Sequence, residues 1–454
     1  MVRSRRATVR SRARVAGCAW LAGVCGLVLV AGLGTAASAA DPVDDGLWYY
    51  NLSGMAEVHQ RTQGEGITIA VLDEPTNPAS PDLIGANLTV QEPAFCADVA
   101  GGPAVSATTT DEIAVHGVNM DSIIVGTGAG VNGQIGARGI APKARVIHYA
   151  SRYHERCLPA ANAPEPRDGM ALAIDMAVGA GAKIISMSHS LPSHTDTAYP
   201  AIARAMKAGV IIVAASPHSR YKGMEFPASA NGVVAVDLID SKSQLSADNT
   251  TDPLLTVVAP GAGFRGIDGT WSTYVYTTGS SEATAYTSAA LALVWSAYPN
   301  ATANQILQTL ITNTGPTDHA VKHDNSWGYG IVNVRHMLAV DPTTYPDVNP
   351  LLRDNNDPET RPTIAQIANP DLPYTRPSEP GTTPDASPSP SASAAATGDA
   401  SGPSTADESG VNVPLITGLG LAGLLVLGVI ATVVVLVVIN RRHATARSQT
   451  PGAG

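Results

Sequence analysis

Short runs of apolar, often β-branched residues recur between residues 67 and 236, and they show no clean alternation of apolar and polar positions. The runs are Ile67–Leu72, Arg145–Tyr149, Lys183–Met187, Val210–Ala214 and Gly232–Val236. Strands without this alternation are covered on both faces, as in a parallel sheet that lies between layers of helices. The pattern therefore predicts a buried, mainly parallel sheet.

Two segments between these runs have the apolar spacing of helices. Asp168–Gly179 and Ala198–Gly209 both end near glycines, and strands that alternate with such helices indicate an α/β fold. We therefore expect an α/β sandwich in which ligands bind beyond the carboxyl ends of the strands.

The N-terminus has the three parts of a secretory signal peptide. An arginine-rich stretch is followed by an apolar run from about Val15 to Leu33 and by small residues at Ala37–Ala39. A membrane helix is the alternative, but the interspersed glycines and the polar sequence from Asp41 onwards favour cleavage. We expect residues 1–40 to be removed and the mature chain to be exported.

A second apolar segment, residues 411–440, lies near the C-terminus. Its part Val413–Ile439 contains no charged residue and is long enough to cross a hydrocarbon core of about 30 Å. Arg441 and Arg442 follow directly, and such cationic flanks stay in the cytoplasm. A buried core helix is the alternative, disfavoured by this length and these arginines. We expect one transmembrane helix, a cytoplasmic tail at 441–454, and a domain held outside the cell membrane.

Residues 355–410 are rich in Pro, Ser, Thr, Ala and Asp. Such a composition buries too little apolar surface to fold, so we expect a stalk. The preceding residues, 41–354, are numerous enough for one extended globular domain.

Cys96 and Cys157 are the two cysteines that remain after the predicted cleavage. In an exported protein such a pair favours a disulfide, and two free buried thiols are the alternative. The net charge of −10 comes with no basic cluster outside the two ends, so the sequence gives no electrostatic footprint for nucleic acid.

Three polar residues stand where catalytic chemistry is expected. Asp73 follows the run Ile67–Leu72 and can orient an imidazole, and His116 begins an apparent buried helix and suits a general base. Ser281 precedes an apolar helix that runs to about Tyr298, so its hydroxyl would lie beside free N–H groups that favour an oxyanion. The order Asp, His, Ser is one of the known orders of a serine protease triad.

Each of these residues also has a simpler interpretation. Asp73 can merely end a strand, His116 can satisfy a helix start, and Ser281 or Ser280 can cap a helix. Their joint order and positions favour the triad.

The flanking motifs strengthen the triad hypothesis. The segments "GITIAVLD", "HGVNMDSIIVG", "GARGIAPKARV", "FPASANGVVAVDLID", "TVVAPGAG" and "TTGSSEATAYTSAALALVWS" together resemble the subtilase family of serine proteases. With its signal peptide, stalk and terminal span, the chain looks most like the mycosins, membrane-anchored subtilases associated with type VII secretion. The resemblance implies a subtilisin-like three-layer sandwich, with Ser281 as nucleophile, His116 as general base and Asp73 fixing the imidazole.

The chain departs from the family pattern at the oxyanion position. Where subtilases carry Gly-Asn, this chain reads Ser216, Pro217 and His218, which puts His218 in the place of the asparagine. Losing such a donor costs about 100- to 1,000-fold in turnover, although the His218 ring N–H can also donate. The alternative is that His218 is an ordinary surface histidine.

Other departures lie at the edge of the primary specificity pocket and directly after Asp73. Its edge, Ser-Leu-Gly-Gly in the family, reads Ser188–Leu191 here, with bulkier residues at the glycine positions. Glu74 and Pro75 replace a small hydroxyl residue and glycine after Asp73. The family's substrate preference therefore does not carry over.

We expect an extracellular, membrane-anchored serine endopeptidase that acts on a protein or peptide substrate without a cofactor. The sequence shows no metal-ligand set, but subtilase calcium sites are assembled from scattered loops, so metal dependence stays open. Type VII secretion components are its implied partners. The alternative is a weakly active or inactive protease fold that serves as a scaffold of a membrane secretion complex. An adhesion module has little support, because the sequence shows no repeat or metal-ligand cluster.

Overall fold

The described part of the chain lies between the two apolar ends. A computed structural model describes residues 45–152, 157–161, 169–191, 197–217, 219, 223–354 and 360–374. The expected signal peptide, transmembrane helix and cytoplasmic tail lie outside these residues, and so does His218. Within the described ranges, no helix combines the length and apolar character needed to cross a membrane.

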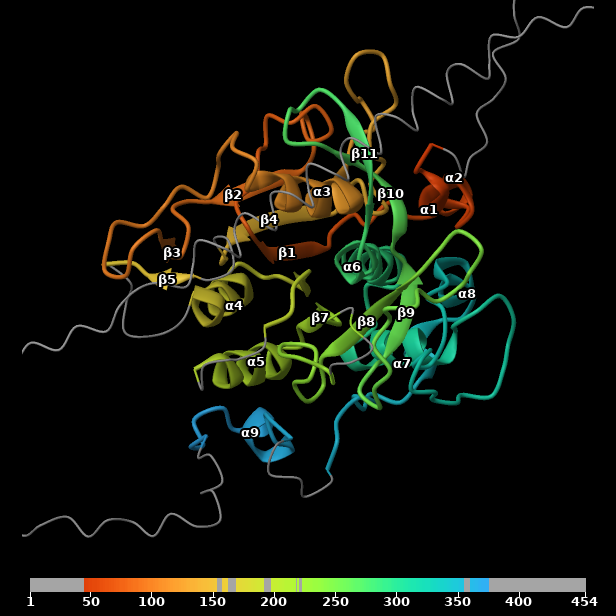
Figure 1. The fold of residues 1–454 in the computed structure, drawn as a ribbon. Coiled ribbons are helices and arrows are strands. Elements are labelled where there is room, and N and C mark those ends of the chain that lie inside the picture. Colours follow the sequence, from red (N-terminus) through yellow and green to blue (C-terminus); the bar gives the residue numbers. More distant parts are fainter. Residues whose placement is uncertain are drawn as a thin grey trace, which may run out of the picture. The chain divides into compact units, whose positions relative to one another are not determined.

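Seven strands form one sheet, in the order β2-β4-β1-β6-β7-β8-β9, and each neighbouring pair is parallel (Figure 1). This confirms the mainly parallel sheet, and all five predicted runs are strands within it. The strands are β1 (Thr68–Asp73), β2 (Leu88–Gln91), β4 (Arg145–Ala150), β6 (Ile184–Met187), β7 (Ile211–Ala215), β8 (Val234–Ile239) and β9 (Val257–Pro260).

Helices cover both faces of the sheet (Figure 1). Because side chains alternate along a strand, Ile69 and Val71 of β1 enter one hydrophobic core, whereas Ala70 and Leu72 enter another. The first core includes α3 (Ala114–Val125) and α6 (Ser280–Ala297), and the second includes α4 (Gly169–Gly179) and α5 (Ala198–Lys207). Apolar and polar residues do not alternate along these strands because both faces of the sheet are buried.

Smaller elements surround these three layers. The antiparallel pairs are β10 with β11 and β3 with β5. These strands and the remaining helices are α1 (Trp48–Asn51), α2 (Met55–Val58), β3 (Cys96–Ala97), β5 (Leu158–Pro159), β10 (Ala262–Ile267), β11 (Tyr274–Thr278), α7 (Ala303–Thr312), α8 (Val334–Ala339), η1 (Pro342–Thr344) and α9 (Ile364–Ala368).

The predicted start of the stalk at residue 355 is wrong for residues 360–374. Helix α9 contacts α5 there, and Thr363 and Gln366 form a capping box at its start. The buried side chain of Asn231 donates hydrogen bonds to the carbonyl oxygens of Arg353 and Pro362. The sequence prediction missed this folded segment because the composition of residues 355–410 as a whole does not reveal the few specific contacts that residues 360–374 make. The rest of the predicted stalk lies outside the described residues.

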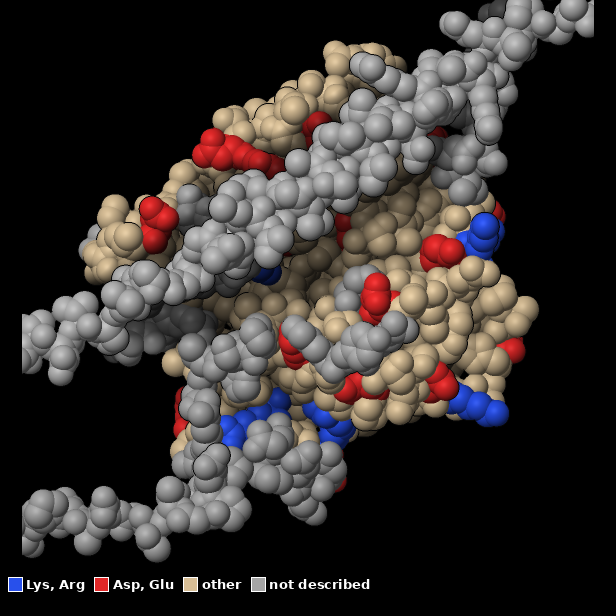
Figure 2. Space-filling view, in the orientation of Figure 1, with Lys and Arg blue, Asp and Glu red and all other residues tan. Residues whose placement is uncertain are grey.

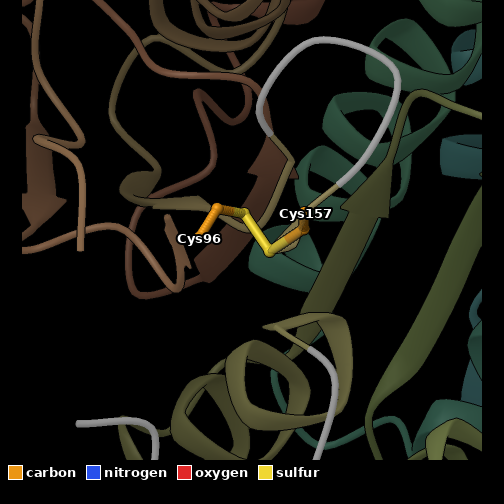
Figure 3. The surroundings of a disulfide bond; sticks show 2 residues. All are labelled: Cys96 and Cys157. Carbon is orange, nitrogen blue, oxygen red and sulfur yellow. A yellow bond between two sulfur atoms is a disulfide. The ribbon is translucent and has the colours of Figure 1, made fainter. Parts of the chain in front are cut away.

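A disulfide joins Cys96 to Cys157, as the sequence predicts, and links the β3–β5 pair (Figure 3). The Cα atoms of the two cysteines are 4.7 Å apart, and the bond closes a loop with a sequence separation of 61 residues. In the chain-entropy account, a loop of this length stabilises the folded state by about 4 kcal/mol.

Replacing both cysteines by serine should lower the free energy of unfolding by about 2–4 kcal/mol, because the unfolded chain gains freedom. Chemical denaturation of the oxidised natural protein and the double variant measures this difference. Dithiothreitol should lower the midpoint of the natural protein and leave that of the variant unchanged. Equal midpoints for the two oxidised proteins would contradict a stabilising disulfide.

Candidate active site

Asp73 is the last residue of β1, and its side chain is buried at the carboxyl edge of the sheet. The Oδ1 atom accepts hydrogen bonds from the Glu74 backbone N–H, at 2.7 Å, and from His116 Nδ1, at 2.6 Å. The Oδ2 atom is buried without a partner. Asp73 is therefore a buried carboxylate whose main side-chain partner is one imidazole.

His116 lies in the first turn of α3 and connects this buried carboxylate to solvent. Its side chain is 38% exposed, whereas that of Asp73 is 2% exposed. Since an ionised carboxylate only accepts hydrogen bonds, the short contact places the proton on Nδ1 and leaves Nε2 of the neutral ring as a proton acceptor. This is the tautomer that a general base needs.

The two groups shift each other's pKa values. Burial lowers the pKa of His116, but the charge of Asp73 and the hydrogen bond outweigh burial and raise it to about 9. Burial raises the pKa of Asp73, and the facing histidines, His116 first, reverse that effect and lower it. The pair therefore favours an ionised carboxylate beside an imidazolium.

A second histidine–carboxylate pair lies behind the first, and the sequence analysis missed it. His148 of β4 and Asp121 of α3 have side chains with 0% exposure, and Nδ1 of His148 lies 3.0 Å from a carboxylate oxygen. Nε2 of His148 donates to the carbonyl oxygen of Glu74 at 2.7 Å. Burial lowers the pKa of His148, and the nearby Asp121 carboxylate more than reverses this and raises it. The pair thus fixes the peptide between Glu74 and Pro75, one residue beyond Asp73.

Close packing against the turn after Asp73 also positions α3. A Cβ atom added at Gly117 would lie 2.5 Å from the carbonyl oxygen of Pro75 and 3.0 Å from that of Glu74. Glycine next to His116 therefore lets the helix approach the turn closely enough for the histidine to reach Asp73.

Ser281 is the second residue of α6, a long helix that is buried along most of its length. Its Oγ donates a hydrogen bond to the carbonyl oxygen of Ser188 at 2.8 Å, and Ser188 Oγ donates to the carbonyl oxygen of Ser281 at 3.1 Å. Ser280 Oγ similarly donates to the carbonyl oxygen of Ser216 at 2.8 Å. These bonds attach the start of α6 to the residues that follow β6 and β7.

His116 and Ser281 line one pocket of about 370 Å³, which we call the His116–Ser281 pocket. Asp73 lies behind His116 and does not line it. In this structure the Ser281 hydroxyl donates to the carbonyl oxygen of Ser188, so this hydrogen bond must break before the hydroxyl can give its proton to His116. The lining residues are Glu74, His116, Arg152, Ser188, His189, Ser190, Ala215, Ser216, Pro217, Gly279, Ser280 and Ser281.

The structure thus joins Asp73 to His116 by a hydrogen bond and places His116 and Ser281 in the lining of one pocket. Ser188 and Ser190, from the altered strand edge, also reach the pocket, as does Pro217. His218 follows Pro217 directly but lies outside the described residues. Among the residues that are described, no group of three or more His, Cys, Asp or Glu side chains is arranged to hold a metal ion.

Comparison with solved structures finds proteins of similar fold, among them a protease of a secretion system. The structure of the MycP3 protease from the type VII (ESX-3) secretion system aligns with a TM-score of 0.50 and 23% identity, covering 66% of this chain and 90% of that one. At this identity the likeness concerns the fold.

Curated relatives give a sequence-level comparison. The thermostable alkaline protease of Halalkalibacterium halodurans is 32% identical over 266 residues, which is 58% of this chain and 66% of the relative. The minor extracellular protease Epr of Bacillus subtilis is 30% identical over 277 residues, which is 60% of this chain and 38% of the relative. The chain thus spans less than two thirds of either relative. Residues 64–330 match the Subtilase family, and the chain belongs to that family.

Proposed function

We propose that this chain is a serine endopeptidase that is exported and held at the outer face of the cell membrane. The observation that carries the proposal is the 2.6 Å hydrogen bond between His116 and Asp73 at the edge of a pocket that also contains Ser281. The subtilase match over residues 64–330 supports it. Anchoring rests on the apolar segment 411–440 and export on residues 1–40.

The proposed reaction is hydrolysis of a peptide bond in two steps. The Ser281 Oγ attacks the carbonyl carbon while Nε2 of His116 takes the hydroxyl proton, and Asp73 stabilises the resulting imidazolium. The backbone N–H of Ser281, at the start of α6, can donate to the oxyanion. His116 then gives its proton to the leaving amine. Water then attacks the acyl carbon while His116 takes one of its protons, and His116 returns this proton to Ser281 Oγ as the bond to the acyl group breaks and the acid leaves.

The proposed biological setting is type VII secretion. The similar MycP3 protease belongs to such a system, and the arrangement of leader, domain, stalk and span resembles the mycosins. A secreted or membrane component of that system would then be the protein substrate or partner.

The orientation of Ser281 supports a second candidate function, a protease fold that acts mainly as a scaffold. Its hydroxyl donates to the Ser188 carbonyl instead of His116, and the sequence replaces the usual oxyanion asparagine with His218. In that case the domain would bind partners of a secretion complex without turnover.

Fluorophosphonate labelling of the full chain tests the nucleophile. We expect covalent labelling that disappears in Ser281→Ala and persists in Ser288→Ala, a control serine further along α6 whose buried hydroxyl has no partner. Gel fluorescence and intact mass measure the adduct. Equal labelling of the natural chain and Ser281→Ala would contradict the assignment.

The pH dependence of that labelling tests the general base. His116 accepts a proton only when neutral, and its pKa is raised to about 9, so the labelling rate should rise with pH to a midpoint near 9. Asp73→Asn removes the charge that raises the pKa, so it should move the midpoint to lower pH and slow labelling by roughly 10⁴-fold. A natural midpoint below the ordinary histidine pKa of about 6.5 would refute this role for the pair.

The His218→Asn variant distinguishes the two candidate functions, an active peptidase and a scaffold without turnover. If the oxyanion site is weakened by the missing asparagine, this variant should be labelled about 100- to 1,000-fold faster than the natural chain. A folded protein that stays unlabelled with and without this change would favour the scaffold. In cells, a scaffold predicts normal secretion with Ser281→Ala and impaired secretion when the domain is deleted.

A further inference from the structure

His148 of β4 is a buried imidazole whose two ring nitrogens both face hydrogen-bond acceptors. Its Nε2 atom lies 2.7 Å from the carbonyl oxygen of Glu74, and its Nδ1 atom lies 3.1 Å and 3.0 Å from the two carboxylate oxygens of Asp121. A carbonyl oxygen only accepts hydrogen bonds, and so does an ionised carboxylate. A neutral imidazole has one N–H and satisfies one of these partners, whereas an imidazolium satisfies both.

Asp121 of α3 carries the matching negative charge. Its Oδ2 atom also accepts a hydrogen bond from the hydroxyl of Thr76 at 2.9 Å, so both carboxylate oxygens act as acceptors. The side chains of His148 and Asp121 have 0% exposure, and charges are buried in proteins where they are paired and hydrogen-bonded. Both conditions are met here, so the geometry fits a buried ion pair.

A short series of hydrogen bonds connects this ion pair to the proposed catalytic carboxylate. His148 holds the carbonyl of Glu74, and the backbone N–H of Glu74 donates to Asp73 Oδ1 at 2.7 Å. The same Oδ1 atom accepts the hydrogen bond from His116 Nδ1. A neutral His148 with its one proton on Nδ1, facing Asp121, would turn the Nε2 lone pair toward the Glu74 carbonyl and repel it. The charge on His148 therefore keeps the turn after Asp73 in place.

In the described part of the chain, the titratable groups whose charges act on His148 are acidic. They are Asp121 on α3 and Asp73 at the end of β1, while the residues paired with His148 on β1 and β2 are valines. Burial lowers the pKa of His148, and the two carboxylates, Asp121 first, more than reverse that effect and raise it. These surroundings favour the protonated ring at neutral pH.

We propose that His148, a buried imidazolium paired with Asp121, is a positioning residue that holds the turn after Asp73. Through this turn it keeps the Asp73 carboxylate directed at His116. The inference rests on the proposed peptidase function. Because its side chain has 0% exposure, His148 does not touch a substrate and acts through the Glu74 peptide. Without His148, the Asp73 carboxylate is less well fixed and raises the pKa of His116 less.

The ¹⁵N NMR shifts of the His148 ring in the full natural chain test its charge. We expect both ring nitrogens to be protonated at about pH 7, where an ordinary histidine is mostly neutral. In Asp121→Asn the ring should become neutral at that pH and keep its proton on Nε2, where the Glu74 carbonyl accepts it. A neutral His148 ring in the natural chain would overturn the proposal.

The pKa of His116 in His148→Leu tests the positioning, in a Ser281→Ala background so that no nucleophile is required. Loss of a positive charge would by itself raise the pKa of His116, whereas loss of positioning lowers it from about 9 toward the ordinary value of about 6.5. We expect a fall in His148→Leu and partial recovery in His148→Gln, whose amide N–H replaces that of Nε2. The control, His59→Leu, removes another imidazole that contacts a backbone carbonyl, that of Ile140, and should leave the pKa of His116 unchanged.

These measurements separate the inference from the proposed function. A lower pKa of His116 in His148→Leu supports the positioning role even if fluorophosphonate never labels the natural chain. An unchanged or higher pKa of His116 in the folded variant overturns that role, and labelling of the natural chain would then leave the peptidase standing. Where His148→Leu does not fold, the same comparison is made with His148→Gln, and the ring charge of His148 in the natural chain needs no variant.

Discussion

The hydrogen bond between His116 and Asp73 is the interaction on which the account of this molecule depends. It joins a 2% exposed carboxylate to a 38% exposed imidazole, so one partner fixes the ring while the other reaches substrate. Its geometry follows from β1, which lies between β4 and β6 in the sheet, and from Gly117, which lets α3 approach the turn after Asp73. The buried His148–Asp121 pair then holds the Glu74 carbonyl. A pair of residues far apart in sequence is thereby held at hydrogen-bonding distance.

Parallel pairing explains why the remaining groups gather at the same place. The carboxyl ends of adjacent parallel strands meet at one edge of a sheet, so β6 delivers Ser188 and His189 while β7 delivers Ser216. Helix α6 begins at this edge, attached through Ser280 and Ser281 to the carbonyl oxygens of Ser216 and Ser188. On the face seen in Figure 2, acidic and basic side chains stand on a mostly uncharged surface.

The sequence predicted the features that periodicity and residue order encode. The apolar runs without alternation indicated the parallel sheet. The order of Asp73, His116 and Ser281 along the chain pointed to a catalytic triad, which stays a prediction. Features that depend on one contact were missed. The His148–Asp121 pair joins a strand to a helix across the fold, and no local pattern reveals it. Helix α9 interrupts a segment of stalk-like composition because Asn231 and a capping box hold it. The hydroxyl direction of Ser281 depends on the Ser188 carbonyl, which a sequence does not place.

The ¹⁵N NMR shifts of the His116 ring, followed through a pH titration of the full chain, test the central claim most directly. They report the tautomer and the pKa without requiring turnover. The account predicts that Nδ1 stays protonated throughout and that Nε2 loses its proton with a midpoint near 9. A neutral ring protonated on Nε2, or a midpoint below about 6.5, would mean that Asp73 does not hold His116 as a general base.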